Sequence, residues 1–344
     1  MGASLNDMIL ETIKLALLMR NNTLDFAKFF ASFFVIVVHS GSYPEMSPAN
    51  ADLFRAASRW AVPFFFLASG YLMGGVGNID VGKKLNKLFG ILFYSSLLYV
   101  PIIYLSTNSD ITTLFIRVFS FDTLRSGTFF HLWFITALMS GVMLTNYMIK
   151  NVKTATGLVI ALLLLAGYWL SDIGQAFNIP AERNYMFYVF RSLLGIPLVY
   201  MGYLLAKEGL LSKISNTMAW TLFIAGIMLM MLEVPLCQWF IDGYARERQF
   251  PLFSVPVAVA LLAICANTAT KENLISRAGR DFSLGIYLIH PFLLYFIVPW
   301  LESKGVKVST VNLVSAFILS WFIFAIMKKW LPALYGKFNG AGIK

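Results

Sequence analysis

The sequence predicts an all-α membrane protein, a polytopic bundle of about ten transmembrane helices kinked around a polar cavity. Two observations carry this prediction. Of the 344 residues, 58% are hydrophobic and only 13% are charged, whereas soluble domains carry roughly 25% charged residues. The apolar residues also gather into runs close to the ~20 residues that a helix needs to cross about 30 Å of hydrocarbon. With so little polar surface available, lipid must be the solvent for most of the chain.

The apolar runs follow one another along the chain, and each is expected to form one span. They cover residues 24–43, 60–77, 88–106, 129–148, 156–171, 187–206, 216–234, 252–267, 283–301 and 309–327. The two shortest, 156–171 and 252–267, could instead be re-entrant segments. Pro63, Pro197 and Pro291 lie inside spans, which favours kinked helices that line a cavity.

The two ends of the chain differ from the spans between them. We expect residues 1–23 to form an N-terminal segment, residues 24–327 the membrane domain, and residues 328–344 a C-terminal tail. Glu11 and Lys14 interrupt the apolar residues of the first segment, so a short amphipathic helix on the membrane surface is expected rather than a signal peptide.

Lysine and arginine predict the orientation in the membrane. If the N-terminus is inside, the cytoplasmic segments hold 16 of the 27 basic residues and the opposite loops hold 10. Because cytoplasmic loops carry the excess of Lys and Arg, both termini are expected in the cytoplasm.

The composition also excludes several classes of protein. Two cysteines and three histidines are too few for a disulfide scaffold or a cysteine- or histidine-rich metal site, so no metal is expected. The net charge of +10 is spread between apolar runs instead of forming one patch, which argues against a nucleic-acid partner. Walker, GxSxG, HExxH and dinucleotide-binding motifs are absent from the sequence, which disfavours ATP-driven transport and standard hydrolase chemistry.

Ionisable groups at membrane depth are the candidate functional residues. A charge within a span costs at least about 2.5 kcal/mol, so it needs a reason to be there. The residues of this kind are Asp25, Lys28, His39, His131, Arg191, Glu233 and His290. All three histidines of the chain are among them.

Several of these residues also have a simpler, structural interpretation. Asp25 and Lys28 are three residues apart and can form a local ion pair at the interface. His131 can be an interfacial residue, and His290 can satisfy the carbonyls that the following Pro291 frees.

His39 is the strongest candidate for chemistry. It follows the apolar run FFVIVV, and a neutral imidazole near pH 7 is well suited to accept and return a proton. The predicted topology places His39 and His131 at the same, outer ends of their helices. The two histidines could therefore share one cavity.

A basic cluster, Lys83, Lys84 and Lys87, follows the second span on the predicted cytoplasmic side. It can be a positive-inside anchor. It can also bind phosphate groups, because lysine ammonium groups are good point-charge partners for them.

The order and spacing of these residues resemble the acyltransferase-3 family of integral membrane acyltransferases, over about residues 22–300. That family's first span has Asp-x-x-Arg, ten residues, and His; here Asp25, Lys28 and His39 stand at this spacing. Lys84 and Lys87 occupy the place of its Arg-x-x-Arg. Lysine keeps the charge at these positions but lacks the bidentate fork of arginine.

Three further segments carry the resemblance. They are RWAVPFFFLASGYLM (59–73), GTFFHLWFITAL (127–138) and SLGIYLIHP (283–291). The first two are also similar to the membrane domain of vancomycin-resistance serine racemases, which is associated with moving serine across the membrane.

The resemblance implies an enzyme of the bacterial inner membrane. Such an enzyme moves an acyl group, usually acetyl from acetyl-coenzyme A, to a hydroxyl of a cell-envelope glycan such as a lipid-linked O-antigen or exopolysaccharide. Its expected partners are acyl-coenzyme A, a lipid-linked saccharide acceptor and membrane lipids.

The resemblance also implies roles for single residues. His39 would deprotonate the sugar hydroxyl or relay the acyl group, and Asp25, Lys28 and His131 would complete the catalytic set. Lys84 and Lys87 would hold the anionic coenzyme. The substrate-binding residues expected from the segments that resemble the family are Trp133, Tyr287 and His290.

Two other functions fit part of the same pattern. A carrier for a small polar solute such as an amino acid would explain the buried polar groups and the kinks without any acyl donor. A purely structural membrane partner is disfavoured by the interior charges.

Overall fold

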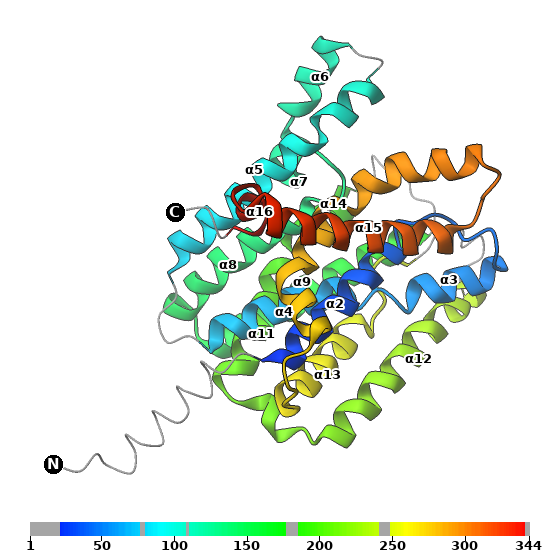
Figure 1. The fold of residues 1–344 in the computed structure, drawn as a ribbon. Coiled ribbons are helices and arrows are strands. Elements are labelled where there is room, and N and C mark those ends of the chain that lie inside the picture. Colours follow the sequence, from blue (N-terminus) through cyan, green and yellow to red (C-terminus); the bar gives the residue numbers. More distant parts are fainter. Residues whose placement is uncertain (1–20, 76–79, 108–109, 177–184, 241–247, 341–344) are drawn as a thin grey trace.

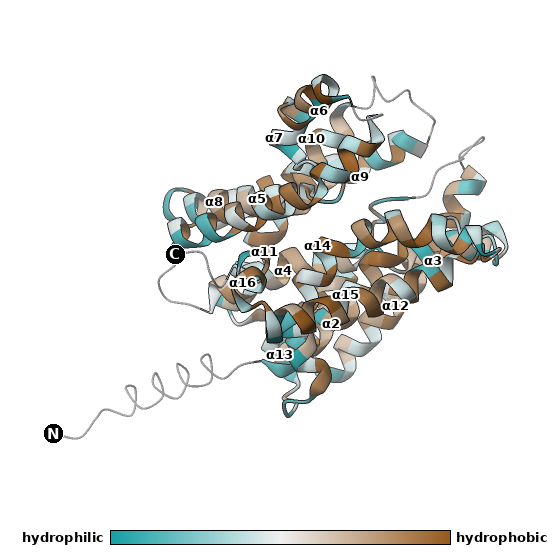
Figure 2. Cartoon of the chain, turned by 45° about the horizontal axis from the view of Figure 1, so that its top comes forward, coloured by the Kyte–Doolittle hydropathy of each residue, from teal (hydrophilic) through white to brown (hydrophobic). Residues whose placement is uncertain are grey.

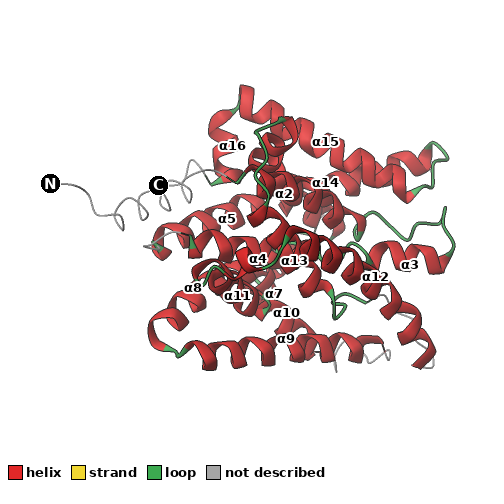
Figure 3. Cartoon of the chain, turned by 90° about the horizontal axis from the view of Figure 1, so that it is seen from below, coloured by secondary structure: helices red, strands yellow, loops and turns green. Residues whose placement is uncertain are grey.

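A computed structural model describes residues 21–75, 80–107, 110–176, 185–240 and 248–340. These residues form helices and short connections without a strand, as Figure 3 shows. The elements are α2 (Asn22–Val37), α3 (Pro48–Ala56), α4 (Ala61–Gly74), α5 (Val81–Ser106), α6 (Ile111–Val118), α7 (Phe121–Ser126), α8 (Trp133–Asn151), α9 (Thr154–Ala176), α10 (Tyr185–Leu193), α11 (Gly195–Lys207), the 3₁₀ turn η1 (Leu210–Lys213), α12 (Asn216–Phe240), α13 (Ser254–Asn267), α14 (Leu274–Ser303), α15 (Ser309–Trp330) and α16 (Pro332–Asn339).

Every apolar run predicted from the sequence overlaps a helix or, for 187–206, the pair α10 and α11. Within the described residues, six helical segments are long and apolar enough to cross a membrane. One of them is Thr154–Gln175, so the run that could have been re-entrant has the length of a full span. Helix α13 has only 14 residues. The chain is thus a multi-pass, all-helical membrane protein, as its sequence predicts.

The bundle has two ends, which we name after residues that lie there. At the Lys84 end, the start of α2 meets the end of α13, because Asn21 donates to the carbonyl of Cys265 over 2.7 Å. At the His39 end, the segment after α2 meets the start of α15: the Glu45 carboxylate accepts a hydrogen bond from the Thr310 backbone N–H over 2.7 Å. At one end of α5, α6 projects from the other helices (Figure 1).

Glycines let the central helices approach closely. A Cβ on Gly70 would collide with the Val199 carbonyl, so only glycine lets α4 pack against α11 at this point. Likewise, a Cβ on Gly279 would collide with the Asp25 carbonyl where α14 crosses α2. Small residues at such crossings are typical of membrane bundles, where close van der Waals packing replaces the hydrophobic effect as the cause of helix association.

Outer helices such as α12 and α15 are largely hydrophobic along their length (Figure 2). Leu163 on α9, Met228 on α12 and Phe322 on α15 are each more than half exposed. Surfaces of this kind are stable in contact with lipid tails but would promote aggregation in water.

The predicted surface helix within residues 1–23 lies almost wholly outside the described residues, which begin at 21. The predicted C-terminal tail, 328–344, starts inside α15 and contains α16, which packs against α5, α14 and α15.

Candidate functional site

The three histidines come together at the His39 end from three separate elements. His39 lies in the turn just after α2, His131 just before α8, and His290 within α14. The His39 and His290 rings are stacked, with centroids 5.4 Å apart and planes at 27°. The His131 and His290 centroids are 5.7 Å apart. The structure thus joins the residues that the sequence could only place at similar depths.

Pro291, inside α14, provides the anchor for this cluster. Pro291 has no N–H, so the carbonyl of Tyr287 loses its helical donor. The Nδ1 of His290 lies 2.8 Å from that carbonyl, which is the structural role that the sequence already suggested for it.

At the next hydrogen bond along α14, a tyrosine hydroxyl is inserted between the backbone donor and acceptor. The Tyr99 hydroxyl donates to the Leu288 carbonyl over 2.8 Å and accepts from the Phe292 N–H over 3.2 Å. Tyr99 was not predicted as a site residue, because nothing in the sequence indicates that this position on α5 meets this part of α14.

Backbone contacts also determine the tautomers of two histidines. Nδ1 of His290 faces the carbonyls of Ile286 and Tyr287, and Nε2 of His131 lies 3.3 Å from the Leu288 carbonyl. Carbonyl oxygens only accept hydrogen bonds, so in a neutral ring these two nitrogens are the ones that carry the hydrogen. The other nitrogens, His290 Nε2 and His131 Nδ1, are buried without a hydrogen-bond partner in the described part of the chain. Two acceptor lone pairs are therefore available beside His39.

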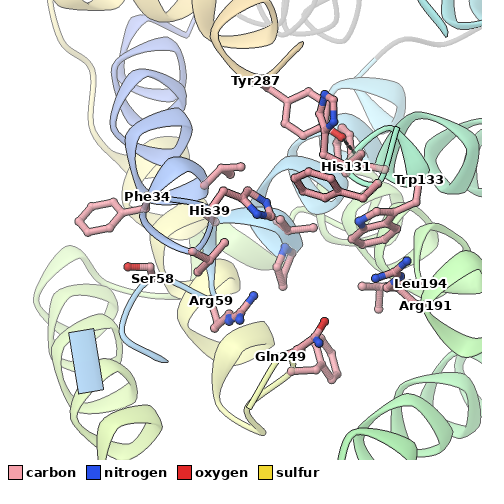
Figure 4. Close-up of a pocket in the computed structure, with 18 of the residues that line it drawn as sticks. Phe34, His39, Ser58, Arg59, His131, Trp133, Arg191, Leu194, Gln249 and Tyr287 are labelled. Atoms are coloured by element: carbon pink, nitrogen blue, oxygen red, sulfur yellow. Dashed lines mark hydrogen bonds between the residues drawn. The ribbon is translucent and has the colours of Figure 1, made fainter. Parts of the chain in front are cut away.

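A cavity of about 110 Å³ opens next to the cluster (Figure 4). Its lining includes His39, His131, Trp133 and Tyr287. His290, whose ring stacks on that of His39, is not part of the lining. The Tyr287 hydroxyl donates to the His131 carbonyl. Four of the predicted catalytic and substrate-binding residues therefore face one space.

A second, more open cavity of about 400 Å³ adjoins the first, and His39 and Phe130 line both. We call the first space the inner cavity and the second the vestibule. The vestibule presents the hydroxyl and amide groups of Ser42, Ser309 and Asn312. His39 thus stands at the junction of the two spaces.

Cationic and polar side chains that the sequence did not assign to the site also line the inner cavity. Arg59 and Arg191 lie on different sides of it in Figure 4, with Gln249 nearby. The Arg191 guanidinium lies 5.2 Å from the Trp133 ring centroid and 5.1 Å from that of Tyr188. Arg191 was recognised in the sequence as an ionisable residue at membrane depth, which was the only signal that could have pointed to it.

A buried ion-pair network positions the chain segment that carries Gln249. Arg248 is fully buried and contacts Asp172 at 2.8 Å and Glu233 at 3.0 Å. Asp172 also accepts the backbone N–H groups of Gln249 and Phe250, at 3.1 and 3.0 Å. This explains the charge of Glu233 at membrane depth, which belongs to a structural network at the edge of the cavity.

The other predicted site residues lie elsewhere. Lys28 and Asp25 form an ion pair of 3.1 Å near the start of α2, about 16 Å along the helix axis from His39. Lys84 and Lys87 lie in the first turns of α5, with the Lys87 side chain against Gly340. The structure does not bring these four residues into contact with the histidine cluster.

A set of side chains that could bind a metal ion was sought among the described residues. There, no group of three or more His, Cys, Asp or Glu side chains is arranged to hold a metal ion.

Comparison with known proteins places the chain. It is 24% identical over 341 residues to a protein named amino-acid racemase from Enterococcus faecalis, covering 90% of this chain and 47% of that protein. A second amino-acid racemase of the same organism is 26% identical over 148 residues, covering 41% of this chain and 20% of that protein. The chain thus spans at most about half the length of these relatives. No solved structure matches. The family model described as an acyltransferase domain matches residues 21–328, so the chain belongs to the acyltransferase-3 family of membrane acyltransferases.

Proposed function

We propose that the protein is a membrane O-acyltransferase that moves an acyl group, acetyl in the first instance, from acyl-coenzyme A to a hydroxyl of a cell-envelope glycan. The observation that carries the proposal is the position of His39. It stands between two cavities at one end of a chain that belongs to an acyltransferase family, beside two histidine nitrogens free to accept hydrogen bonds.

The proposed reaction needs one proton acceptor and one nucleophile. The acceptor hydroxyl donates its proton to His39, and its oxygen attacks the thioester carbonyl carbon. The new C–O ester bond forms as the C–S bond breaks, and the coenzyme thiolate takes the proton back from His39. His131 Nδ1, inside the same cavity lining, can hold the hydroxyl in place by accepting a hydrogen bond before transfer.

The proposed donor approaches from the Lys84 end, which is the cytoplasmic end in the predicted topology. Lys84 precedes Tyr99 by fifteen residues on α5, or about 22 Å along the helix axis. The coenzyme phosphates at Lys84 and Lys87 would therefore be far from the thioester at His39. An apolar cavity of about 370 Å³ extends along α2 from Thr23 to Phe34, and Phe34 also lines the inner cavity. This cavity supports a path for an extended acyl arm.

The test is incubation of inverted membrane vesicles with radiolabelled acetyl-coenzyme A. Label appearing in glycan is expected from vesicles with the wild-type chain and not from vesicles with His39→Ala at equal protein level. Equal labelling by the two kinds of vesicle would contradict the proposal.

A second candidate is a carrier for a small polar solute such as an amino acid. The observation that favours it is the name of the relatives, amino-acid racemases. The first of them matches 90% of this chain, so an amino acid is the small molecule that this comparison suggests. Uptake of radiolabelled serine into vesicles without any labelling of glycan from acetyl-coenzyme A would support the carrier over the enzyme.

A further inference from the structure

We propose that the inner cavity binds an anionic group of the acceptor, a carboxylate or a phosphate, through Arg191. This inference rests on the proposed function and deepens it, because it makes the acceptor an acidic saccharide. The observations are the lining of the cavity, the environment of Arg191 and the contrast with a second arginine at the same end of the bundle.

The cavity lining is positive in character. Its polar members among the described residues are Ser58, Tyr168, Gln249 and residues of the histidine cluster, together with Arg59 and Arg191, and no carboxylate is among them. Arg191 stands on the wall of a cavity whose described lining residues include no acidic side chain. Such a site favours an anion over a neutral or cationic ligand.

The two arginines at this end of the bundle, Arg191 and Arg248, have different neighbours. Arg248 contacts two carboxylates, Asp172 and Glu233. Arg191 instead lies over the rings of Trp133, at 5.2 Å, and Tyr188, at 5.1 Å, and no carboxylate contacts it within the described chain.

An aromatic ring contacts the face of a guanidinium group, so the N–H groups, which point outward in the guanidinium plane, can still donate hydrogen bonds. Arg191 makes no hydrogen bond to the described residues, so its N–H groups can donate to a ligand oxygen, whereas donors of Arg248 are already used by protein carboxylates.

The dimensions of the two spaces suggest how an acidic sugar would lie. The inner cavity, about 110 Å³, has room for a small charged group, and the vestibule, about 400 Å³, for the rest of the saccharide. An anionic group at Arg191 would then leave a neighbouring hydroxyl near His39, at the junction of the two spaces. Specificity for acidic acceptors would follow from this geometry.

The experiment measures binding to the purified full-length chain in detergent, without any acyl donor. Thermal stability is recorded during titration with glucuronate, glucose 1-phosphate and glucose. We expect at least one of the two anions to raise Tm with saturation and glucose to have no effect. The responding anion tells carboxylate from phosphate recognition.

Variants assign the effect to Arg191. Arg191→Gln should weaken anion binding at least about tenfold, because hydrogen bonds to a charged group are lost. Arg191→Lys should bind with intermediate affinity, since the charge remains but the planar fork is lost, and this variant keeps the test valid if the glutamine variant is unstable. The matched control is Arg117→Gln, which changes an exposed arginine on α6 and should bind like the wild type.

Three outcomes would overturn the proposal: no response to either anion, an equal response to glucose, or unchanged affinity in both Arg191 variants. Because no acyl transfer is measured here, failure of the vesicle assay would refute the acyltransferase without touching the anion site. Conversely, acyl transfer to a neutral glycan without any anion binding would support the acyltransferase and refute the anion site.

Discussion

Replacing Asp172 with Asn should destabilise the protein far more than the same replacement at an exposed ion pair. Asp172 and Arg248 are 1% and 0% exposed and lie 2.8 Å apart. Asparagine keeps the size and one acceptor oxygen but removes the charge that neutralises a buried guanidinium. Breaking a buried pair costs about 3–5 kcal/mol, and because Glu233 remains at 3.0 Å from Arg248, we expect the lower value, about 3 kcal/mol.

The control is Asp122→Asn, which removes a pair of almost the same length, 2.9 Å, whose carboxylate is 81% exposed. Exposed pairs contribute about 0–1 kcal/mol. Thermal unfolding in one detergent should show a fall in Tm of about 5 °C or more for Asp172→Asn, and little change for the control. Equal shifts in the two variants would refute the argument that burial makes the Asp172 pair costly to break.

Three further predictions concern function and topology. If His39 is the general base, His39→Ala and His39→Gln should both lower acetyl transfer in vesicles by about 10²–10⁴-fold. The Gln variant should fail because an amide cannot accept the proton at neutral pH. Substantial transfer by the Gln variant would make the role of His39 structural and leave His131 as the next candidate for the general base. Replacing both Lys84 and Lys87 with Ala should raise the KM for acetyl-coenzyme A while the protein is still inserted in the membrane. Replacing both with Arg should preserve use of the donor. An unchanged KM in the double Ala variant would mean that these lysines serve only to orient the chain in the membrane. Cysteine labelling from the two sides of the membrane should find both termini in the cytoplasm, and an external C-terminus would refute the ten-span topology.

The sequence by itself predicted the helical membrane architecture, because the physics involved is local. A run of about 20 apolar residues must satisfy its backbone hydrogen bonds internally in lipid, and a helix is the way for a single segment to do so. The ionisable groups at membrane depth could be recognised for the same reason, since each one departs visibly from its apolar neighbours. His39, His131 and His290 were all found in this way.

Only the tertiary structure decided which of these groups meet. His39 and His131 share a cavity because α14, around Pro291, gathers carbonyls that anchor the His131 and His290 rings. No spacing along the chain encodes a contact between positions 157 residues apart, such as His131 and Leu288. The same holds for Tyr99, whose role depends on the close passage of α5 beside this part of α14.

The charges show the division most clearly. In the sequence, Arg191 and Glu233 were equivalent, two ionisable residues within predicted spans. In the fold, Glu233 neutralises Arg248, whereas Arg191 faces a cavity between aromatic rings. Hydropathy depends on composition along one helix, but whether a charge is paired depends on which helices pack beside it, and that is a property of the assembled bundle alone.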